Sequence, residues 1–477
     1  WTIMSSYNKI NGVYTSESEW LLTNVLRNEW GFKGLVMTDW FGGKSPSSQI
    51  SAGNDLLEPG TNRQWKALTK GVKNGELSMD AIDKAAKRIL TLIFKTKKMQ
   101  NYRVNNSPDL KKHAGITRNS AAEGMVLLKN KNSLPFTNEK NIALLGITSY
   151  EFIAGGTGSG DVNEAYTISL EEGFLNAGFK INKTAKKIVE SHRKVNSDGF
   201  VKPQGLDAIF SPFSPPEIIY TTDQINNIVA TSDIGVLTLG RNSGEGGDRS
   251  EKDDFLLTKT EQEMIVKFTD AFHKKNKKVI VVLNIGGVIE TASWKHLPDA
   301  ILLAWQGGQE GGNSVVDILS GRVNPSGKLP MTFPEKLSDH ESHKNFPKNP
   351  KMITIEGLIK NLIFPPSETP KIDKVKDEDY TFYHEGIFVG YRHFDTKNLA
   401  VSFPFGFGLS YTDFEYGPME AKIENDTINI SLNITNVGEF PGKEVVQFYT
   451  EKVNSTIKRP FQELKSFTKT KRLENDE

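Results

Sequence analysis

One short run, Gly34-Leu-Val-Met-Thr-Asp-Trp40, combines the features on which the fold prediction depends. Its central residues are apolar or β-branched, which predicts a short buried strand. The strand ends in an acid, Asp39, followed by an aromatic residue, Trp40. In a barrel of parallel strands and helices the carboxyl ends of the strands carry the catalytic groups, so this aspartate is placed for chemistry. The plainer alternative is that Asp39 caps the following helix.

Strands and helices alternate around this run over residues 1–100, which predicts parallel βα units. Apolar periodicity and capping residues define the segments. The last helix has the clearest signals, with Ser78 as N-cap and Asp80 in its first turn. Besides Gly34–Trp40, the predicted strands are Thr2–Asn8 and Gly53–Glu58, and the predicted helices are Glu17–Asn28 and Met79–Lys95.

Residues 114–416 also alternate between predicted strands and helices, but with longer apolar runs. This pattern is typical of a doubly wound α/β layer domain. A stretch at 335–380, rich in Lys, Asp, Glu and Pro, interrupts it and is interpreted as a surface insertion with one short helix at Ile353–Phe364. The predicted strands are Asn141–Gly146, Ser232–Gly240, Lys278–Asn284 and Ala300–Trp305, and the predicted helices are Ala121–Lys129, Lys259–Lys274 and Asn313–Leu319.

Residues 418–477 change to a period of two. Ile428, Ile430, Leu432 and Ile434 alternate with polar residues, and a second strand is predicted at Glu444–Thr450. This pattern is typical of an antiparallel β-sandwich. The segment is too short for the roughly 100 residues of a complete sandwich, so an incomplete domain is expected.

Composition excludes several classes of function. A net charge of +1 gives no reason to expect a nucleic-acid partner, and no apolar run is long enough for a membrane helix. The chain has no cysteine, and its eight histidines show no metal-ligand spacing, so neither a metal nor another cofactor is expected. The chain begins at Trp1 without an initiator methionine or signal peptide, so an N-terminus that is lost or processed, or a fragment, is expected. Any export signal would lie in the missing part, and a periplasmic or secreted location is favoured.

A glycine-rich loop, Arg241-Asn-Ser-Gly-Glu-Gly-Gly-Asp-Arg249, follows another predicted strand. Its glycines make it compact and able to approach a ligand, and Glu245 is the candidate carboxylate. Asp248 and Arg249 are expected to pair and brace the loop; a plain surface loop is the alternative. Glycoside hydrolysis needs two carboxyl groups, one ionised and one protonated. Asp39 and Glu245 are candidates for that pair.

The competing motifs are weak. Gly155-Gly-Thr-Gly-Ser-Gly160 lacks the Gly-Lys-Ser/Thr ending of a phosphate loop and the spacing of a dinucleotide fingerprint. An oxidoreductase or kinase would depend on this loop alone, and a sugar-side or structural role is favoured. The acid in Gln309-Glu-Gly-Gly312 is interpreted as a structural element at the entry of a helix.

Several independent motifs in fixed order make the chain similar to glycoside hydrolase family 3, in its multi-domain β-glucosidase branch. The resemblance covers nearly the whole chain. The motifs are Met4-Ser-Ser-Tyr-Asn8, Asn11-Gly12, Gly31-Phe-Lys-Gly34, Thr38-Asp39-Trp40, Ala122-Glu-Gly-Met-Val-Leu-Leu-Lys129, Leu134-Pro135, Ser243-Gly-Glu-Gly-Gly-Asp-Arg249, Gln309-Glu-Gly-Gly312, Asn324-Pro-Ser-Gly-Lys-Leu-Pro330, Glu385-Gly-Ile-Phe-Val-Gly-Tyr-Arg392 and Phe403-Pro-Phe-Gly-Phe-Gly-Leu-Ser-Tyr411.

The resemblance implies the C-terminal portion of a (β/α)8 barrel at 1–100, an α/β sandwich at 114–416, and an incomplete fibronectin III-like domain at 418–477. It implies a retaining double displacement that removes terminal β-D-glucosyl residues from a β-glucoside or oligosaccharide. Asp39 falls on the family's nucleophile and Glu245 on its acid/base. The remaining residues expected to bind substrate are Tyr7, Trp40, Met4, Ser243 and Arg249.

The chain also departs from the family. It would hold about three of the eight barrel units, and the glucose-binding Asp, Arg and Lys-His positions of the earlier strands have no counterpart. The isolated chain is therefore expected to be poorly active and its intact parent active. Alternatives are a β-xylosidase of the same family, a β-N-acetylglucosaminidase, which the Ser243–Arg249 motif argues against, and a non-catalytic carbohydrate-binding protein. A homodimer is also possible in this family.

Overall fold

The computed structural model describes residues 1–162, 164–203, 213–245, 249–345 and 381–477. The chain divides into two compact units, Trp1–Pro108 and Asp109–Glu477, which are described separately. The helix predicted at Ile353–Phe364 lies outside the described residues, as does Asp248. The sandwich and fibronectin-like boundaries inside the second unit stay predictions.

The first unit is built around a parallel strand pair. Strand β1 (Thr2–Ser5) pairs with β4 (Leu35–Thr38) in the register Thr2↔Leu35 to Ser5↔Thr38, and a single bridge joins Met37 to Leu56. The other elements are the hairpin β2 (Lys9–Ile10) and β3 (Val13–Tyr14), the short turns η1 (Thr15–Glu17) and η3 (Lys97–Gln100), the π-helix η2 (Trp20–Glu29), and the helices α1 (Pro46–Ala52), α2 (Asn62–Lys73) and α3 (Met79–Lys95).

Capping chemistry explains where the helices of this unit begin. The prediction for Met79–Lys95 is confirmed at both ends, and the Ser78 hydroxyl accepts the Ala81 amide at 3.2 Å. The predicted strand at Gly53–Glu58 is wrong, because only the Leu56 bridge forms there. The segment is held instead by the side chain of Asp55. This buried carboxylate accepts the Val36 amide and pairs with Arg27 and Arg88 at 2.8 Å each.

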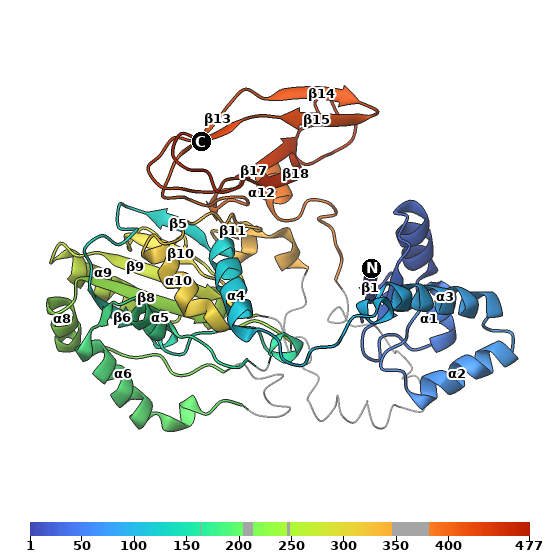
Figure 1. Cartoon of the computed structure of the whole chain (residues 1–477), viewed down its shortest axis with the longest axis horizontal. Helices are drawn as coiled ribbons and strands as arrows, with labels where there is room; N and C mark the ends of the chain where they lie inside the picture. The colour runs from blue at the N-terminus through green and yellow to red at the C-terminus, as the bar shows by residue number, and fades with distance from the viewer. Residues whose placement is uncertain (163, 204–212, 246–248, 346–380) are drawn as a thin grey trace. The chain divides into compact units, whose positions relative to one another are not determined.

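The second unit contains a six-stranded sheet in the order β5-β10-β9-β8-β6-β7 (Figure 1). All neighbouring pairs are parallel except β5 with β10. All seven residues of β9 are buried, and because alternate side chains point to opposite faces, both faces of this strand are covered. The strands are β5 (Val126–Asn130), β6 (Asn141–Leu145), β7 (Lys180–Ile181), β8 (Ile234–Arg241), β9 (Val279–Ile285) and β10 (Ala300–Leu303).

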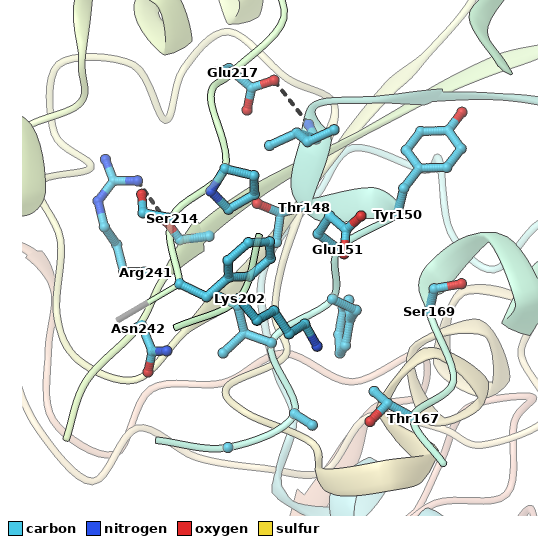
Figure 2. A pocket seen from close by; sticks show the side chains of 18 of the residues that line it. Thr148, Tyr150, Glu151, Thr167, Ser169, Lys202, Ser214, Glu217, Arg241 and Asn242 are labelled. Carbon is cyan, nitrogen blue, oxygen red and sulfur yellow. Dashed lines mark hydrogen bonds between the residues drawn. The ribbon is translucent and has the colours of Figure 1, made fainter. Parts of the chain in front are cut away.

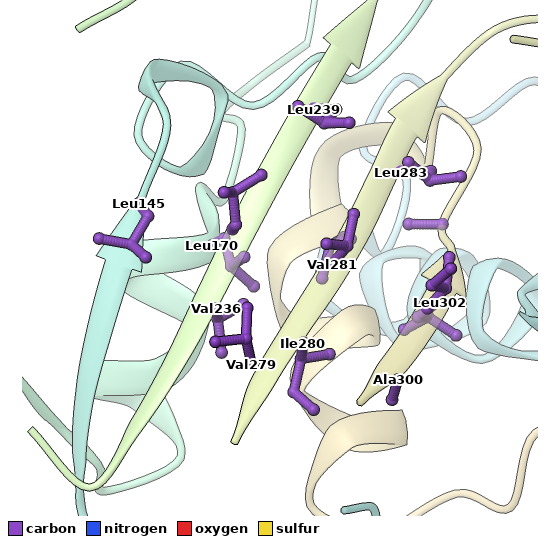
Figure 3. Close-up of a cluster of buried hydrophobic side chains, with 14 of the residues drawn as sticks. Leu145, Leu170, Val236, Leu239, Val279, Ile280, Val281, Leu283, Ala300 and Leu302 are labelled. Carbon is purple, nitrogen blue, oxygen red and sulfur yellow. The ribbon is translucent and has the colours of Figure 1, made fainter. Parts of the chain in front are cut away.

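Two groups of helices pack with this sheet. In one group α10 contacts both α4 and α5, and in the other α8 contacts both α6 and α9. Figure 3 shows the apolar side chains that fill the core along the strands, among them Leu145, Val236, Val281 and Leu302. The helices are α4 (Leu110–Gly124), α5 (Leu170–Asn176), α6 (Lys183–Val195), α8 (Thr222–Ala230), α9 (Lys259–His273) and α10 (Gly311–Leu319).

The predicted helix at Ala121–Lys129 is wrong. Helix α4 ends at Gly124, and the chain continues as strand β5. Val126 and Leu127 are fully buried, and β5 pairs with β10 at the edge of the sheet. The run of apolar residues that looked like a helical continuation is therefore a buried strand, a confusion that periodicity alone does not resolve.

The C-terminal part of this unit consists of antiparallel pairs, as the period of two predicts. Strand β15 forms within the predicted alternating strand and pairs with β14, which was not predicted, but Ile428 and Ile430 keep 59% and 38% of their surface exposed. The alternation of apolar and polar residues in β15 therefore correctly indicates a strand, but its apolar side is not buried by the described residues. The elements are β11 (Phe333–Pro334) with β12 (Val401–Phe403), β13 (Phe414–Tyr416) with β16 (Ile434–Asn436), β14 (Glu420–Glu424) with β15 (Thr427–Ser431), β17 (Val445–Thr450) with β18 (Glu463–Lys469), and helix α12 (Tyr391–Lys397).

Candidate functional site

Asp39 follows the carboxyl end of β4 directly. Its amide donates to Ser5 O at 3.1 Å, which extends the parallel ladder by one residue. Its carboxylate oxygen Oδ1 accepts the Tyr7 hydroxyl at 2.8 Å and the Trp40 amide at 2.6 Å. Both donors act on one oxygen, so they orient the carboxylate rather than merely neutralise it. The interpretation of Asp39 as the cap of the next helix is wrong, because Ser45 caps α1.

The aromatic residues beside Asp39 are open to solvent within this unit. Tyr7 and Trp40 expose 54% and 56% of their surface, and Met4 exposes 58%. Large aromatic faces left bare next to an acid are suited to pack against a ring of a ligand. Phe41 has φ of +58°, a left-handed conformation that a bulky residue adopts only under constraint and that often marks functional sites. Sequence patterns gave no sign of this turn.

Glu245 belongs to the second unit, on the loop after β8. Its carboxylate accepts the Ser159 hydroxyl at 2.5 Å and the Ser159 amide at 3.1 Å. The Thr157 hydroxyl donates to the Glu245 backbone oxygen at 3.2 Å, and Thr157 also forms a parallel bridge with Gly244. The glycine-rich loop Gly155–Gly160 thus holds the acid in place.

Gly158 explains why this loop is rich in glycine. A Cβ at this position would lie 2.3 Å from Glu245 Oε2, and its φ of +68° is left-handed. Both facts favour glycine here. Ser159 and Thr157 were not predicted as partners of the acid, although the unusual density of glycine at 155–160 was a visible signal.

Two further residues of the Glu245 loop are occupied by structural contacts. The Ser243 carbonyl accepts the Thr157 amide at 3.2 Å. Arg249 donates from Nη2 to Asp254 at 2.6 Å and from Nη1 to Val288 O at 2.8 Å. Arg249 is therefore braced by Asp254, while the pairing expected with Asp248 lies outside the described residues. Roles of Ser243 and Arg249 in binding substrate stay predictions.

Glu310 has the structural role expected of it. It is buried at the start of α10 and accepts the Tyr166 hydroxyl at 2.5 Å and the Asn313 side-chain amide at 2.7 Å. The hydrogen bond raises the pKa of the Tyr166 hydroxyl. Its carboxylate is thus committed to anchoring the loop that precedes α5.

The structure brings the sequence-predicted residues together in two sets. Tyr7, Trp40 and Asp39 meet in the first unit, and Ser243 and Glu245 share a loop in the second. The separation of Asp39 from Glu245 stays a prediction. Across the described ranges, no cluster of three or more His, Asp or Glu residues could hold a metal ion. No helix in the same ranges has the length and hydropathy needed to cross a membrane.

The first unit places a carboxyl group at a strand end, and the second unit carries another on a glycine-rich loop that follows a strand of its parallel sheet. Two carboxyl groups are the residue chemistry that glycoside hydrolysis requires. The family described as "Glycosyl hydrolase family 3 N terminal domain" matches residues 1–92, and "Glycosyl hydrolase family 3 C-terminal domain" matches residues 125–411. The chain belongs to glycoside hydrolase family 3, and it falls in the β-glucosidase branch.

Known relatives support this assignment. The thermostable β-glucosidase B of Acetivibrio thermocellus is 34% identical over 98% of the chain and 56% of that protein. An exo-α-(1→6)-L-arabinopyranosidase of Bifidobacterium breve is 29% identical over 98% of the chain and 56% of its own length. The solved β-glucosidase 3B of Thermotoga neapolitana, in complex with glucose, is 39% identical with a TM-score of 0.86. It is matched over 100% of this chain and 64% of its own, so the chain spans little more than half of these relatives.

Proposed function

We propose that the chain supplies the catalytic carboxyl pair of a retaining glycoside hydrolase that removes terminal β-D-glucosyl residues. The observation that carries the proposal is Asp39 at the end of β4, with Oδ1 held by the Tyr7 hydroxyl and the Trp40 amide. The β-glucosidase names of relatives favour glucosides, and they do not favour the β-xylosidase alternative. The predicted layout of a partial barrel, an α/β sandwich and a fibronectin III-like domain is part of the same proposal.

The reaction proceeds in two displacements. In the first, an Asp39 carboxylate oxygen bonds to the anomeric carbon while the glycosidic C–O bond breaks, and the Glu245 proton goes to the leaving oxygen. In the second, Glu245 takes a proton from water, the water oxygen bonds to the anomeric carbon, and the bond to Asp39 breaks. Two inversions return the original configuration. This requires carboxyl groups about 5–5.5 Å apart.

Hydrolysis of 4-nitrophenyl β-glucoside by the full-length gene product tests the proposal directly. Release of nitrophenolate, together with the β-anomer of glucose as the first product seen by NMR, would support it. A folded protein that released α-glucose first would contradict a retaining mechanism, and one that released no nitrophenolate would contradict the assignment as a glucosidase.

Removal of the acid should affect substrates according to their leaving groups. We expect Glu245→Ala to slow alkyl glucosides about 10²–10⁴-fold, because these need protonation, and activated aryl glucosides much less. Azide should restore rate by attacking the glycosyl enzyme and give β-glucosyl azide. Glu251→Ala, in an exposed acid of the same loop region, is the matched control. Equal losses with aryl and alkyl substrates would show that Glu245 is not the acid.

The hydroxyl of Tyr7 should matter through Asp39. We expect Tyr7→Phe to lower kcat/KM about 10-fold or more, because a hydrogen bond to a charged group is removed. Tyr102→Phe, an exposed tyrosine of the same unit, is the control. An unchanged rate in Tyr7→Phe, or an equal loss in Tyr102→Phe, would contradict a role of the Tyr7 hydroxyl in orienting Asp39.

A further inference from the structure

The second unit contains a cavity of about 920 Å³ that none of the proposed reaction steps uses (Figure 2). Neither Asp39 nor Glu245 is among its lining residues. The wall after β6 includes Thr148 and Glu151, and the wall after β8 includes Arg241 and Asn242. Glu217 lies on a segment that approaches both walls, and its side chain is drawn at the edge of the cavity.

The topology of the sheet marks this place as a ligand position. Strands β6 and β8 are parallel neighbours, but the chain leaves β6 through α5 to β7 on one side. It leaves β8 through α9 to β9 on the other side. The connections therefore diverge above the carboxyl ends of β6 and β8. In open α/β sheets ligands bind in such a crevice, at the topological switch point.

The charges around the cavity exclude anionic ligands. Nine carboxylate side chains and three cationic side chains line it among the described residues. Arg241 donates to both carboxylate oxygens of Glu261, at 2.6 and 2.8 Å, and Arg193 pairs with Glu151 at 2.6 Å. Burial acts to lower the pKa of Arg241, but the bonds to Glu261 raise it, so the guanidinium stays charged and committed. The third cation, Lys202, lies 5.6 Å from the centre of the Phe213 ring. A phosphate would therefore meet one lysine, no unpaired arginine and an excess of negative charge.

The same lining is suited to a neutral polyhydroxylated ring. Carboxylate oxygens accept hydrogen bonds from hydroxyl groups, and such charge-assisted bonds are the stronger kind. Three aromatic residues, Tyr150, Phe152 and Phe213, also line the cavity. Small-molecule sites usually combine aromatic surfaces with a few polar groups that fix the orientation of the ligand.

We propose that this cavity is a second saccharide site, separate from the catalytic pair, which binds a neutral mono- or disaccharide between the carboxylates and the aromatic wall. Glu217 is the acceptor at the edge of the cavity whose position is best defined, because its Oε1 is fixed by the amides of Ile147 and Ile218 at 2.9 and 2.8 Å. Phe213 supplies an apolar face for the ring. The site goes beyond the proposed hydrolysis, which needs neither residue.

Titration of the full chain with cellobiose tests this site, using calorimetry and ligand-observed NMR. The chain carries Asp39→Asn in every sample, so that no turnover occurs. At pH 8, above the pKa of about 7 of Glu217, we expect binding that weakens about tenfold in Glu217→Gln, which keeps the carbonyl acceptor for the two amides but loses the charge-assisted bond to sugar. Phe213→Ala should weaken it comparably by removing the ring face.

Glu263→Gln and Phe467→Ala are the matched controls, since Glu263 is half-exposed on α9, Phe467 is exposed, and neither lines the cavity. Unchanged affinity in both controls would support the site. The proposal fails if cellobiose does not bind, if Glu217→Gln and Phe213→Ala bind as tightly as the parent, or if spermidine or glucose 6-phosphate displaces cellobiose. Hydrolysis of nitrophenyl glucoside is measured separately, so failure of this site and failure of the proposed function are distinguishable.

Discussion

Replacing Asp39 by glycine is expected to reduce hydrolysis of aryl β-glucosides by about 10⁴-fold or more in the full-length gene product. Without the carboxylate no covalent glycosyl intermediate forms, and the space left behind admits a small anion. Azide should then attack the anomeric carbon directly from the vacated face. The product would be α-glucosyl azide, with inverted configuration, identified by the anomeric coupling constant in its NMR spectrum.

Asp39→Asn separates the chemical role of this residue from its structural one. The amide oxygen still accepts the Tyr7 hydroxyl and the Trp40 amide, so the melting temperature should stay close to that of the parent. The weaker nucleophile should still lose nearly all turnover. The assignment would be overturned if either variant kept more than about a tenth of parental kcat, or if azide gave only the β-glucosyl azide expected of an acid/base variant.

Most strands and helices of the fold could be predicted from local sequence patterns. Buried strands such as β9 are continuous apolar runs, and α3 has a serine cap, an acid in the first turn and a regular apolar stripe. These features act within a few residues, so sequence reasoning finds them. Strand β5 was missed because its apolar run follows α4 without a break in composition, and only pairing with β10 makes it a strand.

In the candidate site, too, residues placed by local sequence were predicted, and residues placed by long-range contacts were not. Asp39 was found because the acid directly follows the strand that positions it. Ser159 and Thr157 were missed because they contact Glu245 across more than 80 positions of sequence, and no local pattern encodes such a contact. Arg249 was recognised as a brace, but its contact with Asp254 on the next short turn was not predicted. Nothing in the spacing singles out this acid.

The solvent exposure of the isoleucines in the β14–β15 hairpin could not be predicted from local sequence either. The alternation at Thr427–Ser431 correctly predicted a strand, but a buried face also needs a covering layer from elsewhere. Ile423, opposite Ile428 in the hairpin, is 78% exposed. Periodicity therefore specifies which residues share a face, while burial depends on partners that the period does not name.

Glu217 should make the stability of the second unit depend on pH in an unusual direction. Burial raises the pKa of this carboxyl to about 7, against an ordinary value of 4.5. The folded state therefore prefers the protonated form. Its contribution to stability is fully present below pH 4.5 and is lost as the pH rises through 7. Between pH 5 and pH 8 this group should lower the free energy of unfolding by roughly 3 kcal/mol.

Glu217→Gln should remove that dependence, because the amide stays neutral at every pH while its oxygen still accepts the amides of Ile147 and Ile218. Urea unfolding of parent and variant at pH 5, 6, 7 and 8 measures the difference. The two should be nearly equal at pH 5, and the variant should be more stable at pH 8. Glu251→Gln, an exposed carboxylate, should follow the parent throughout. Parallel curves for parent and Glu217→Gln would mean that Glu217 ionises in the folded protein without cost, and that the crevice between β6 and β8 is as well solvated as the surface.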